Sequence, residues 1–223
     1  MTELPYDCWC NHLTDVDCKW RKVDYDSRVI VRGLKDEPFN GYLDINIKGV
    51  RTRFTTENIG LLIDRLLPAI GRQLRNDIAA PISLVPIPNS GMAIGAPGPF
   101  RVVELAQKVA QGFGEGATVC AALRWDAVRP KAHQTAQYRH PGLYEPHLRL
   151  IERPAAPIVL FDDVLTSGSQ MIAAARLLTK EGLAPERGLV VAHAGKVQDE
   201  AGLLAKRPDT LDLSDEPFDF DAF

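Results

Sequence analysis

Two adjacent carboxylates followed by a hydroxyl-rich turn are the residues best suited to chemistry. Asp162 and Asp163 come directly after the apolar run Ile158–Phe161. The turn that follows them consists of Thr166, Ser167, Gly168, Ser169 and Gln170. Its hydroxyls and backbone N–H groups can donate to a phosphate, and the two carboxylates can hold sugar hydroxyls or a hydrated Mg²⁺. The segment therefore predicts a site that binds a phosphate at one end and a sugar diol at the other.

A strand and a helix must hold this site in place. Ile158–Phe161 has the apolar character of a buried strand, and the pattern from Met171 to Lys180 predicts a helix that ends at Gly182. A strand–loop–helix of this kind directs N–H groups at one point, where the helix dipole adds positive potential. Gly168 lets the backbone approach a ligand closely.

This segment resembles the PRPP-binding motif of type I phosphoribosyltransferases, which has four apolar residues, two acids, two spacers and a Thr/Ser-Gly loop. The resemblance implies an α/β fold with a parallel sheet flanked by helices. It also implies transfer of phosphoribosyl from PRPP to a nitrogen acceptor, a nucleobase or an amine, with Mg²⁺. Asp162 and Asp163 would orient the ribose and hold Mg²⁺ through water, and the turn Thr166, Ser167, Gly168, Ser169 and Gln170 would bind the 5′-phosphate. The alternative is a phosphate-binding α/β domain of another class.

A glycine-rich loop follows an expected strand at Ile82–Ile87 and precedes an expected helix from Phe100 to Gln111. The resemblance implies that this loop binds pyrophosphate, through Asn89, Ser90, Gly91 and Arg101. Similar proteins usually have basic residues in the loop, whereas this chain has none before Arg101. Pyrophosphate would then depend largely on backbone N–H groups. A plain connector is the alternative.

A basic segment between Arg124 and Arg153 contains six Lys or Arg residues against three acids. It resembles the flexible catalytic loop of the family, which implies that Lys131 and Arg139 cover the leaving diphosphate. Pro86-Ile87-Pro88 and the Gln residues before Arg139 are similar to the ComF-like branch, which is associated with natural competence and DNA uptake. The alternative is a solvated basic loop.

The N-terminal region contains three cysteines and a histidine, Cys8, Cys10, Cys18 and His12. ComF-like proteins often begin with a zinc module, so these residues are candidate zinc ligands, but their spacing does not form two Cys-x-x-Cys pairs. A loose arm with incidental thiols is the alternative.

Arg28–Lys35 and Tyr42–Lys48 are expected to form a hood hairpin, and a helix from Thr56 is expected to kink or split at Pro68. We expect an arm and hood over residues 1–55 and a phosphoribosyltransferase-like domain over 56–207.

The C-terminal region is expected to contain a strand at Arg187–His193, a polar helix over Val197–Lys206, and an acidic, disordered tail over 208–223. From Asp209 onward the chain has six acids, no Lys or Arg, and a terminal Phe223. This ending resembles the tail tip of bacterial single-stranded-DNA-binding proteins, which implies a protein partner that accepts the Phe. A solubilising tail is the alternative.

Composition excludes several classes of protein. The chain has 223 residues, of which 45% are hydrophobic and 25% charged, with a net charge of −3. These values are typical of one globular domain and demand neither nucleic acid nor membrane. No apolar stretch is long enough to span a bilayer and no signal peptide is visible, so we expect a cytoplasmic protein. Resemblance to the family implies a homodimer. Two functions stay open, a catalytic phosphoribosyltransferase or a non-catalytic PRPP- or nucleotide-binding regulator in DNA metabolism.

Overall fold

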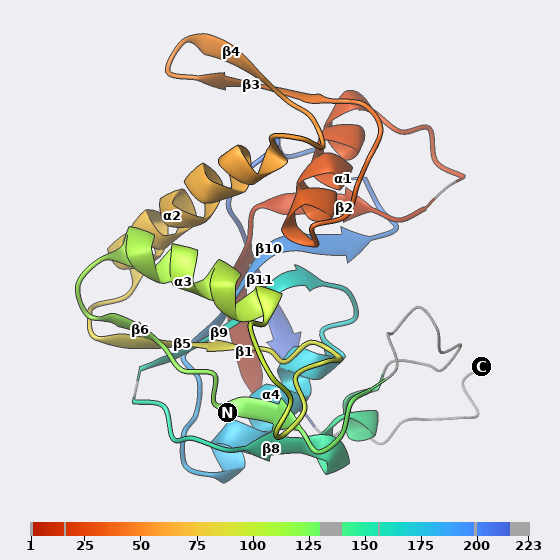
Figure 1. Cartoon of the computed structure of the whole chain (residues 1–223). Coiled ribbons are helices and arrows are strands. Elements are labelled where there is room, and N and C mark those ends of the chain that lie inside the picture. The colour runs from red at the N-terminus through yellow and green to blue at the C-terminus, as the bar shows by residue number, and fades with distance from the viewer. Residues whose placement is uncertain (1, 16, 130–139, 156, 199, 215–223) are drawn as a thin grey trace.

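A seven-stranded, mostly parallel sheet forms the centre of the molecule (Figure 1). The computed structural model describes residues 2–15, 17–129, 140–155, 157–198 and 200–214. The strand order is β11-β1-β10-β9-β5-β6, and β2 continues alongside β10. The strands are β1 Glu3–Cys8, β2 Cys10–Leu13, β5 Ile82–Pro86, β6 Ala117–Val119, β9 Ile158–Leu165, β10 Arg187–Gly195 and β11 Arg207–Asp212. All neighbours are parallel except β1 and β11.

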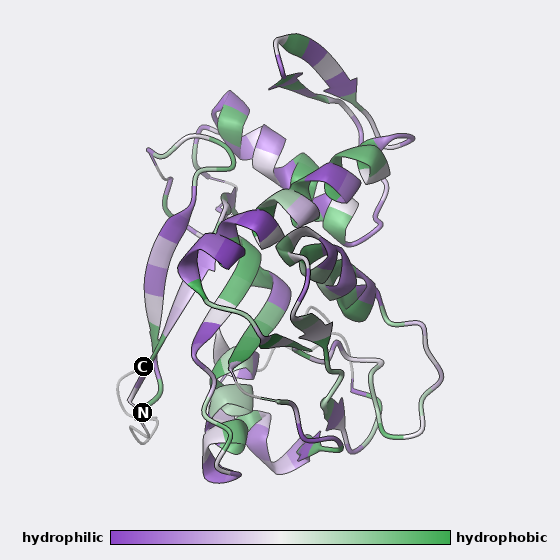
Figure 2. Cartoon of the chain, turned by 90° about the vertical axis from the view of Figure 1, so that its left-hand side faces the viewer, coloured by the Kyte–Doolittle hydropathy of each residue, from purple (hydrophilic) through white to green (hydrophobic). Residues whose placement is uncertain are grey.

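Helices cover both faces of this sheet, which confirms the predicted α/β architecture. The helices α1 Lys22–Leu34, α2 Ile59–Asp77 and α3 Arg101–Phe113 lie on one face, and α4 Ser169–Lys180 lies on the other (Figure 1). Alternate residues of β9 supply the two cores. Val159 and Phe161 pack with α1, α2 and α3, whereas Ile158 and Leu160 pack with α4. The middle strands are accordingly hydrophobic along most of their length (Figure 2).

The connections from β5 and β9 leave the sheet in opposite directions. β5 leads through α3 to the edge strand β6, and β9 leads through α4 on the other face to β10. The two strands are parallel neighbours, with Pro86 opposite Phe161. In open α/β sheets such a reversal leaves a crevice at the carboxyl ends of the strands, where ligands bind. The topology thus directs attention to the loops after Pro86 and Phe161.

Two expectations for the N-terminal third are wrong. Arg28–Lys35 was expected to be a strand because Val29-Ile30-Val31 is β-branched, but it lies almost wholly in α1. Packing of Ile30 and Leu34 in the core overrides that propensity. The hairpin instead pairs β3 Leu43–Ile47 with β4 Val50–Phe54. Lys48 and Gly49 both have positive φ, 51° and 85°, as a two-residue hairpin turn requires.

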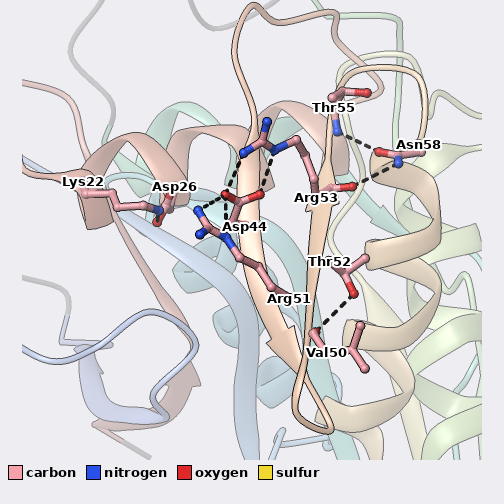
Figure 3. A network of polar contacts seen from close by, with 9 residues as sticks. All are labelled: Lys22, Asp26, Asp44, Val50, Arg51, Thr52, Arg53, Thr55 and Asn58. Atoms are coloured by element: carbon pink, nitrogen blue, oxygen red, sulfur yellow. Dashed lines mark hydrogen bonds and ion pairs between the residues drawn. The ribbon is translucent and has the colours of Figure 1, made fainter.

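The β3–β4 hairpin projects from the body of the protein (Figure 1). At its base Leu43 and Phe54 are paired and buried in the core. Figure 3 shows Asp44 between two guanidinium groups, accepting from Arg53 Nε at 2.9 Å and from Arg51 Nε at 3.1 Å. These contacts hold the pKa of Asp44 well below its usual range, and the hydrogen bond from Arg53 has the largest effect. Arg53 also lies over the Tyr42 ring at 3.7 Å, so this face of the hairpin is tightly connected.

Other elements also differ from the sequence-based expectations. Pro68 does not split α2, which is one helix and approaches α3 so closely that a Cβ on Gly112 would lie 2.0 Å from the Pro68 carbonyl oxygen. After α3 the chain forms β6 and then β7 Leu123–Trp125, and β7 pairs with β8 Leu148–Leu150. Short 3₁₀ turns at Pro141–Leu143 and Glu145–His147 fit the prolines there.

The C-terminal region contributes an edge strand to the sheet. Residues 197–206 outside position 199 contain no helix, so the helix expected there is wrong. Residues 208–212, expected to belong to the disordered tail, form most of β11 because they pair with β1 through the whole of that strand. Residues 215–223 lie outside the described part of the chain. No helix in the described part has the length and apolar character needed to cross a membrane.

Candidate functional site

The acid pair lies in the carboxyl-terminal half of β9, which continues four residues beyond the predicted end at Phe161. Asp162 pairs with Val190 of β10, so the sheet fixes its position. The amide of Asp163 donates to Asp162 Oδ1 at 2.8 Å, and the amide of Val164 donates to Asp163 Oδ1 at 2.8 Å. Both side chains are therefore oriented by the backbone, at the carboxyl end of the central strand.

Electrostatics make this pair a candidate cation site. Burial raises the pKa of Asp162 well above its ordinary value, and the neighbouring Asp163 raises it further. Lys35 has the opposite effect and lowers this pKa. A cation near two crowded carboxylates would relieve both burial and repulsion.

The donor set fits a hydrated Mg²⁺, which commonly takes one or two carboxylates and completes its shell with water and substrate phosphates. Asp162 and Asp163 are the two carboxylates available for this. In the described residues no group of three or more His, Cys, Asp or Glu is arranged to hold a metal. The remaining ligands of Mg²⁺ would therefore come from water and from the bound phosphate compound.

The hydroxyl-rich turn connects β9 to α4, as the sequence predicts. Thr166 and Ser167 are exposed, Ser169 is buried, and the Oγ atoms of Ser167 and Ser169 lie 3.0 Å apart. Gly168 precedes the helix with φ +75°, and a Cβ there would lie 2.7 Å from Leu211 Cδ2. Only glycine fits this backbone without strain. Gln170, half-buried in the first turn of α4, completes the predicted set.

The glycine-rich loop lies directly beside the acid pair. The amide of Ile87 donates to the carbonyl oxygen of Phe161 at 2.8 Å. The Trp125 indole donates to the carbonyl oxygens of Pro88 at 3.1 Å and Asn89 at 2.9 Å, which turns these oxygens toward the core. Among backbone hydrogen bonds of the described residues, the amides of Asn89 and Ser90 have no acceptor. These amides are thus available to a ligand between the two loops.

Arg101, expected at the pyrophosphate, makes a different contact. Its Nε donates to the Leu34 carbonyl oxygen at 3.1 Å and its Nη2 to that of Gly33 at 3.2 Å. These bonds fasten the N-terminal end of α3 to the C-terminal end of α1. Favourable charge at a helix C-terminus explains the arrangement. Arg101 therefore positions α1.

Lys35 is a residue that the sequence reading missed. It immediately follows α1, it is exposed, and it makes no ion pair with the residues that the structure describes. Its positive charge lowers the pKa of Asp162. No local motif marks it, because it approaches the site only through the packing of α1. The other predicted cations, Lys131 and Arg139, lie outside the described residues.

The zinc expectation is not supported. Cys8 packs in the core under α4, whereas Cys10 packs in the core under α1, α2 and α3, so the two thiols face opposite sides of the sheet. Burial raises the pKa of Cys10 to about 12, which keeps it a thiol. Cys18 lies 3.7 Å from Asp15 Oδ2. Burial, followed by Lys35 and two arginines of α1, lowers the pKa of His12 to about 4, so His12 is neutral.

No protein-family model matches this chain. No curated protein matches it either. Among solved structures, it is similar to a hypoxanthine phosphoribosyltransferase from Staphylococcus aureus, with 12% identity and a TM-score of 0.37 over 62% of this chain and 68% of that one. It is similar to an orotate phosphoribosyltransferase from Aeropyrum pernix, with 15% identity and a TM-score of 0.38 over 75% and 83%. An adenine phosphoribosyltransferase gives 18% identity and a TM-score of 0.38 over 74% and 89%. The description of the fold therefore rests on the sheet topology itself.

Proposed function

We propose that this protein binds PRPP and transfers its phosphoribosyl group to a nitrogen acceptor, in the manner of type I phosphoribosyltransferases. One observation carries the proposal. The acid pair Asp162–Asp163, the hydroxyl turn 166–170 and the loop Asn89–Gly91 meet at the point where the sheet connections reverse. Such a place suits a ligand with a phosphate, a ribose and a diphosphate in a row.

The residues would divide the work as follows. The turn Thr166–Gln170 binds the 5′-phosphate, and Asp162 with Asp163 orients the ribose hydroxyls. The bond from C1 to the diphosphate oxygen breaks and the diphosphate takes the electron pair, a bond from C1 to the acceptor nitrogen forms, and the proton of that nitrogen leaves to water. The amides of Asn89 and Ser90, with Gly91, receive the diphosphate, and Lys35 adds a positive charge. Mg²⁺ held through water by the acid pair would supply further charge neutralisation.

The expected roles of Lys131 and Arg139 remain part of this proposal, as covering cations for the diphosphate. Alanine at either position should reduce turnover more than PRPP affinity, because these side chains would act on the leaving group. A loss of affinity alone, with turnover per bound PRPP unchanged, would contradict that role. The ComF-like affiliation, the link to DNA uptake, the homodimer and a protein partner for the tail are proposed on sequence resemblance.

A second function, a non-catalytic PRPP sensor in DNA metabolism, is favoured by one observation. The loop at Asn89–Gly91 has no basic side chain, and Arg101 is bonded to the Gly33 and Leu34 carbonyls. Fewer cations at the diphosphate would weaken stabilisation of the leaving group more than binding of PRPP. Release of diphosphate in the presence of acceptor bases separates the two functions.

Calorimetric titration with PRPP and Mg²⁺, with ribose 5-phosphate for comparison, tests the site. Binding should require Mg²⁺ and favour PRPP. Asp163→Asn should weaken PRPP binding by about tenfold or more while the melting temperature stays close to that of the unmodified protein. Asp64→Asn is the matched control, because Asp64 is an exposed carboxylate of α2 that pairs with Lys108. Unchanged affinity in Asp163→Asn would remove the acid pair from the proposed site.

A further inference from the structure

Three side chains distant in sequence form a hydrogen-bonded chain on the α4 face of the sheet. Tyr6 Oη donates to Asp209 Oδ2 at 2.8 Å, and it lies 3.2 Å from Nδ1 of His193. The Tyr6 and His193 rings meet edge to face, with centroids 6.1 Å apart. Tyr6 is only 2% exposed, so the arrangement is built into the fold. The proposed chemistry uses none of these residues.

The donors in this chain fix the tautomer of His193. A phenol has one proton, and Tyr6 gives it to the Asp209 carboxylate, which can only accept when ionised. Burial and Asp209 raise the pKa of Tyr6 above its ordinary value, so Tyr6 keeps this proton. The oxygen of Tyr6 must then accept from Nδ1–H of His193. The second nitrogen, Nε2, points away from Tyr6 because the two ring nitrogens face different sides of an imidazole.

The strands that carry these hydrogen-bonded side chains border the hydroxyl turn on two sides. His193 is opposite Leu165, the last residue of β9 and the neighbour of Thr166. Leu211, two residues after Asp209 in β11, packs so closely on Gly168 that a Cβ there would be 2.7 Å away. The strand that carries Asp209 thus supports the turn, and the strand that carries His193 ends beside it.

We propose that His193 binds, through Nε2, the phosphate monoester held by the turn Thr166–Gln170, and that Tyr6 and Asp209 are positioning residues. This inference rests on the proposed function and deepens it. If these contacts served only to hold β11 against β1, Tyr6 and Asp209 would be sufficient. An imidazole at the end of β10 would not be needed. A phosphate dianion bound at Nε2 would favour protonated imidazole. In that form Nδ1 donates to Tyr6 and Nε2 donates to the phosphate.

Two amide substitutions separate the roles of the two nitrogens. Asn places its amide near the position of Nδ1, and Gln places its amide near that of Nε2. His193→Asn should weaken ribose 5-phosphate binding about tenfold, whereas His193→Gln should stay within about threefold of the unmodified protein. Tyr6→Phe should give an intermediate loss of ribose 5-phosphate affinity. It removes the oxygen that fixes the tautomer of His193 but keeps the imidazole ring. His147→Asn, at an exposed histidine that contacts Asp126, is the control.

Nitrogen-15 spectra of the His193 ring provide an independent measurement. Addition of ribose 5-phosphate should protonate both nitrogens, and free ribose should leave the spectrum unchanged. Normal ribose 5-phosphate binding by His193→Asn, or an unchanged Nε2 signal on binding, would overturn the inference alone. A responding Nε2 without preference for PRPP over ribose 5-phosphate would support the inference and reject the proposed transferase. Absence of binding by either compound would reject both.

Discussion

The amide of Ile87 donates to the carbonyl oxygen of Phe161 at 2.8 Å, at the end of the ladder between β5 and β9. Beyond this bond the chain from Ile87 turns into the loop Asn89–Gly91, and the chain from Phe161 continues into the acid pair. One backbone hydrogen bond thus places a potential diphosphate loop beside two carboxylates. The following expectations depend on this neighbourhood.

Asp162→Asn should stabilise the free protein at neutral pH while abolishing Mg²⁺-dependent PRPP binding. The pKa of Asp162 is raised in the folded state, so the native state holds the proton more tightly than the unfolded chain does. Stability is therefore lost as pH rises from the unfolded pKa through the folded pKa. Asparagine does not ionise, so it removes this loss of stability. Its side-chain oxygen can still accept from the Asp163 amide.

Thermal unfolding between pH 4 and pH 8 measures this effect. The variant should gain on the order of 1 kcal/mol at pH 8, and the gain should shrink toward pH 4, close to the unfolded pKa of about 3.9, because the two states then differ less in bound protons. Asp64→Asn, on the surface of α2, should show no such trend. A lower melting temperature for Asp162→Asn throughout this range would contradict this expectation. It would mean that the charge of Lys35 already offsets the cost of the ionised Asp162 carboxylate.

Lys35→Gln should weaken PRPP binding and make it less sensitive to salt. The ammonium lowers the pKa of Asp162, so its removal should also move the pH dependence of Mg²⁺-supported binding to higher pH. For an exposed cation we expect a loss of about threefold to tenfold at low ionic strength. Calorimetry at two salt concentrations and at several pH values measures both effects.

Lys108→Gln is the matched control for Lys35, because Lys108 lies on α3 and pairs with Asp64. Equal losses in the two variants would indicate a general effect of net charge. A loss confined to Lys35→Gln, with ribose 5-phosphate bound as before, would assign the ammonium to the diphosphate end of the ligand.

Trp125→Phe should weaken PRPP more than ribose 5-phosphate. The indole holds the Pro88 and Asn89 carbonyls, and phenylalanine leaves these two oxygens without that donor. The loss of a buried donor should cost about 1–3 kcal/mol of stability and loosen the loop expected to bind diphosphate. The ratio of the two affinities, measured by calorimetry, reports on the loop.

Trp9→Phe controls for the loss of an indole, since Trp9 donates to Gln73 Oε1 at 2.7 Å, outside this loop. It should reduce stability without changing the affinity ratio. An unchanged ratio in Trp125→Phe would show that the loop Asn89–Gly91 does not depend on this contact for its conformation.

The part of the site that the sequence predicts is the part that is local. Asp162 to Gln170 are consecutive, and their strand–loop–helix setting follows from apolar runs and a glycine. The α1 region could not be predicted in the same way, because Val29-Ile30-Val31 favours a strand until packing of Ile30 and Leu34 is known. Lys35 was missed for the same reason.

Contacts between distant positions also escape sequence reading. Tyr6 meets His193 across 187 positions and Asp209 across 203, and no spacing rule connects them. Arg101 looked available for pyrophosphate because the α1 carbonyls that bind it are nearly seventy residues earlier. The composition of residues 208–212 suggested a tail, and only their pairing with β1 shows a strand.

The end of β11 gives a final prediction about where the chain can be shortened. A protein ending at Ser214 keeps β11, the contact of Asp209 with Tyr6, and the bond from Arg176 Nε to the Leu213 carbonyl oxygen at 3.2 Å. Its melting temperature and ribose 5-phosphate affinity should match those of the full chain. A protein ending at Lys206 loses the strand and exposes the edge of β1, so it should melt earlier or aggregate.

The same pair of proteins tests the proposed tail partner. Capture of a partner by the full chain but not by the chain ending at Ser214 would assign binding to residues 215–223, because the folded sheet is the same in both. If the chain ending at Ser214 instead lost ribose 5-phosphate binding at an unchanged melting temperature, the final residues would contribute to the site, and the turn at Gly168 would not be sufficient for phosphate binding.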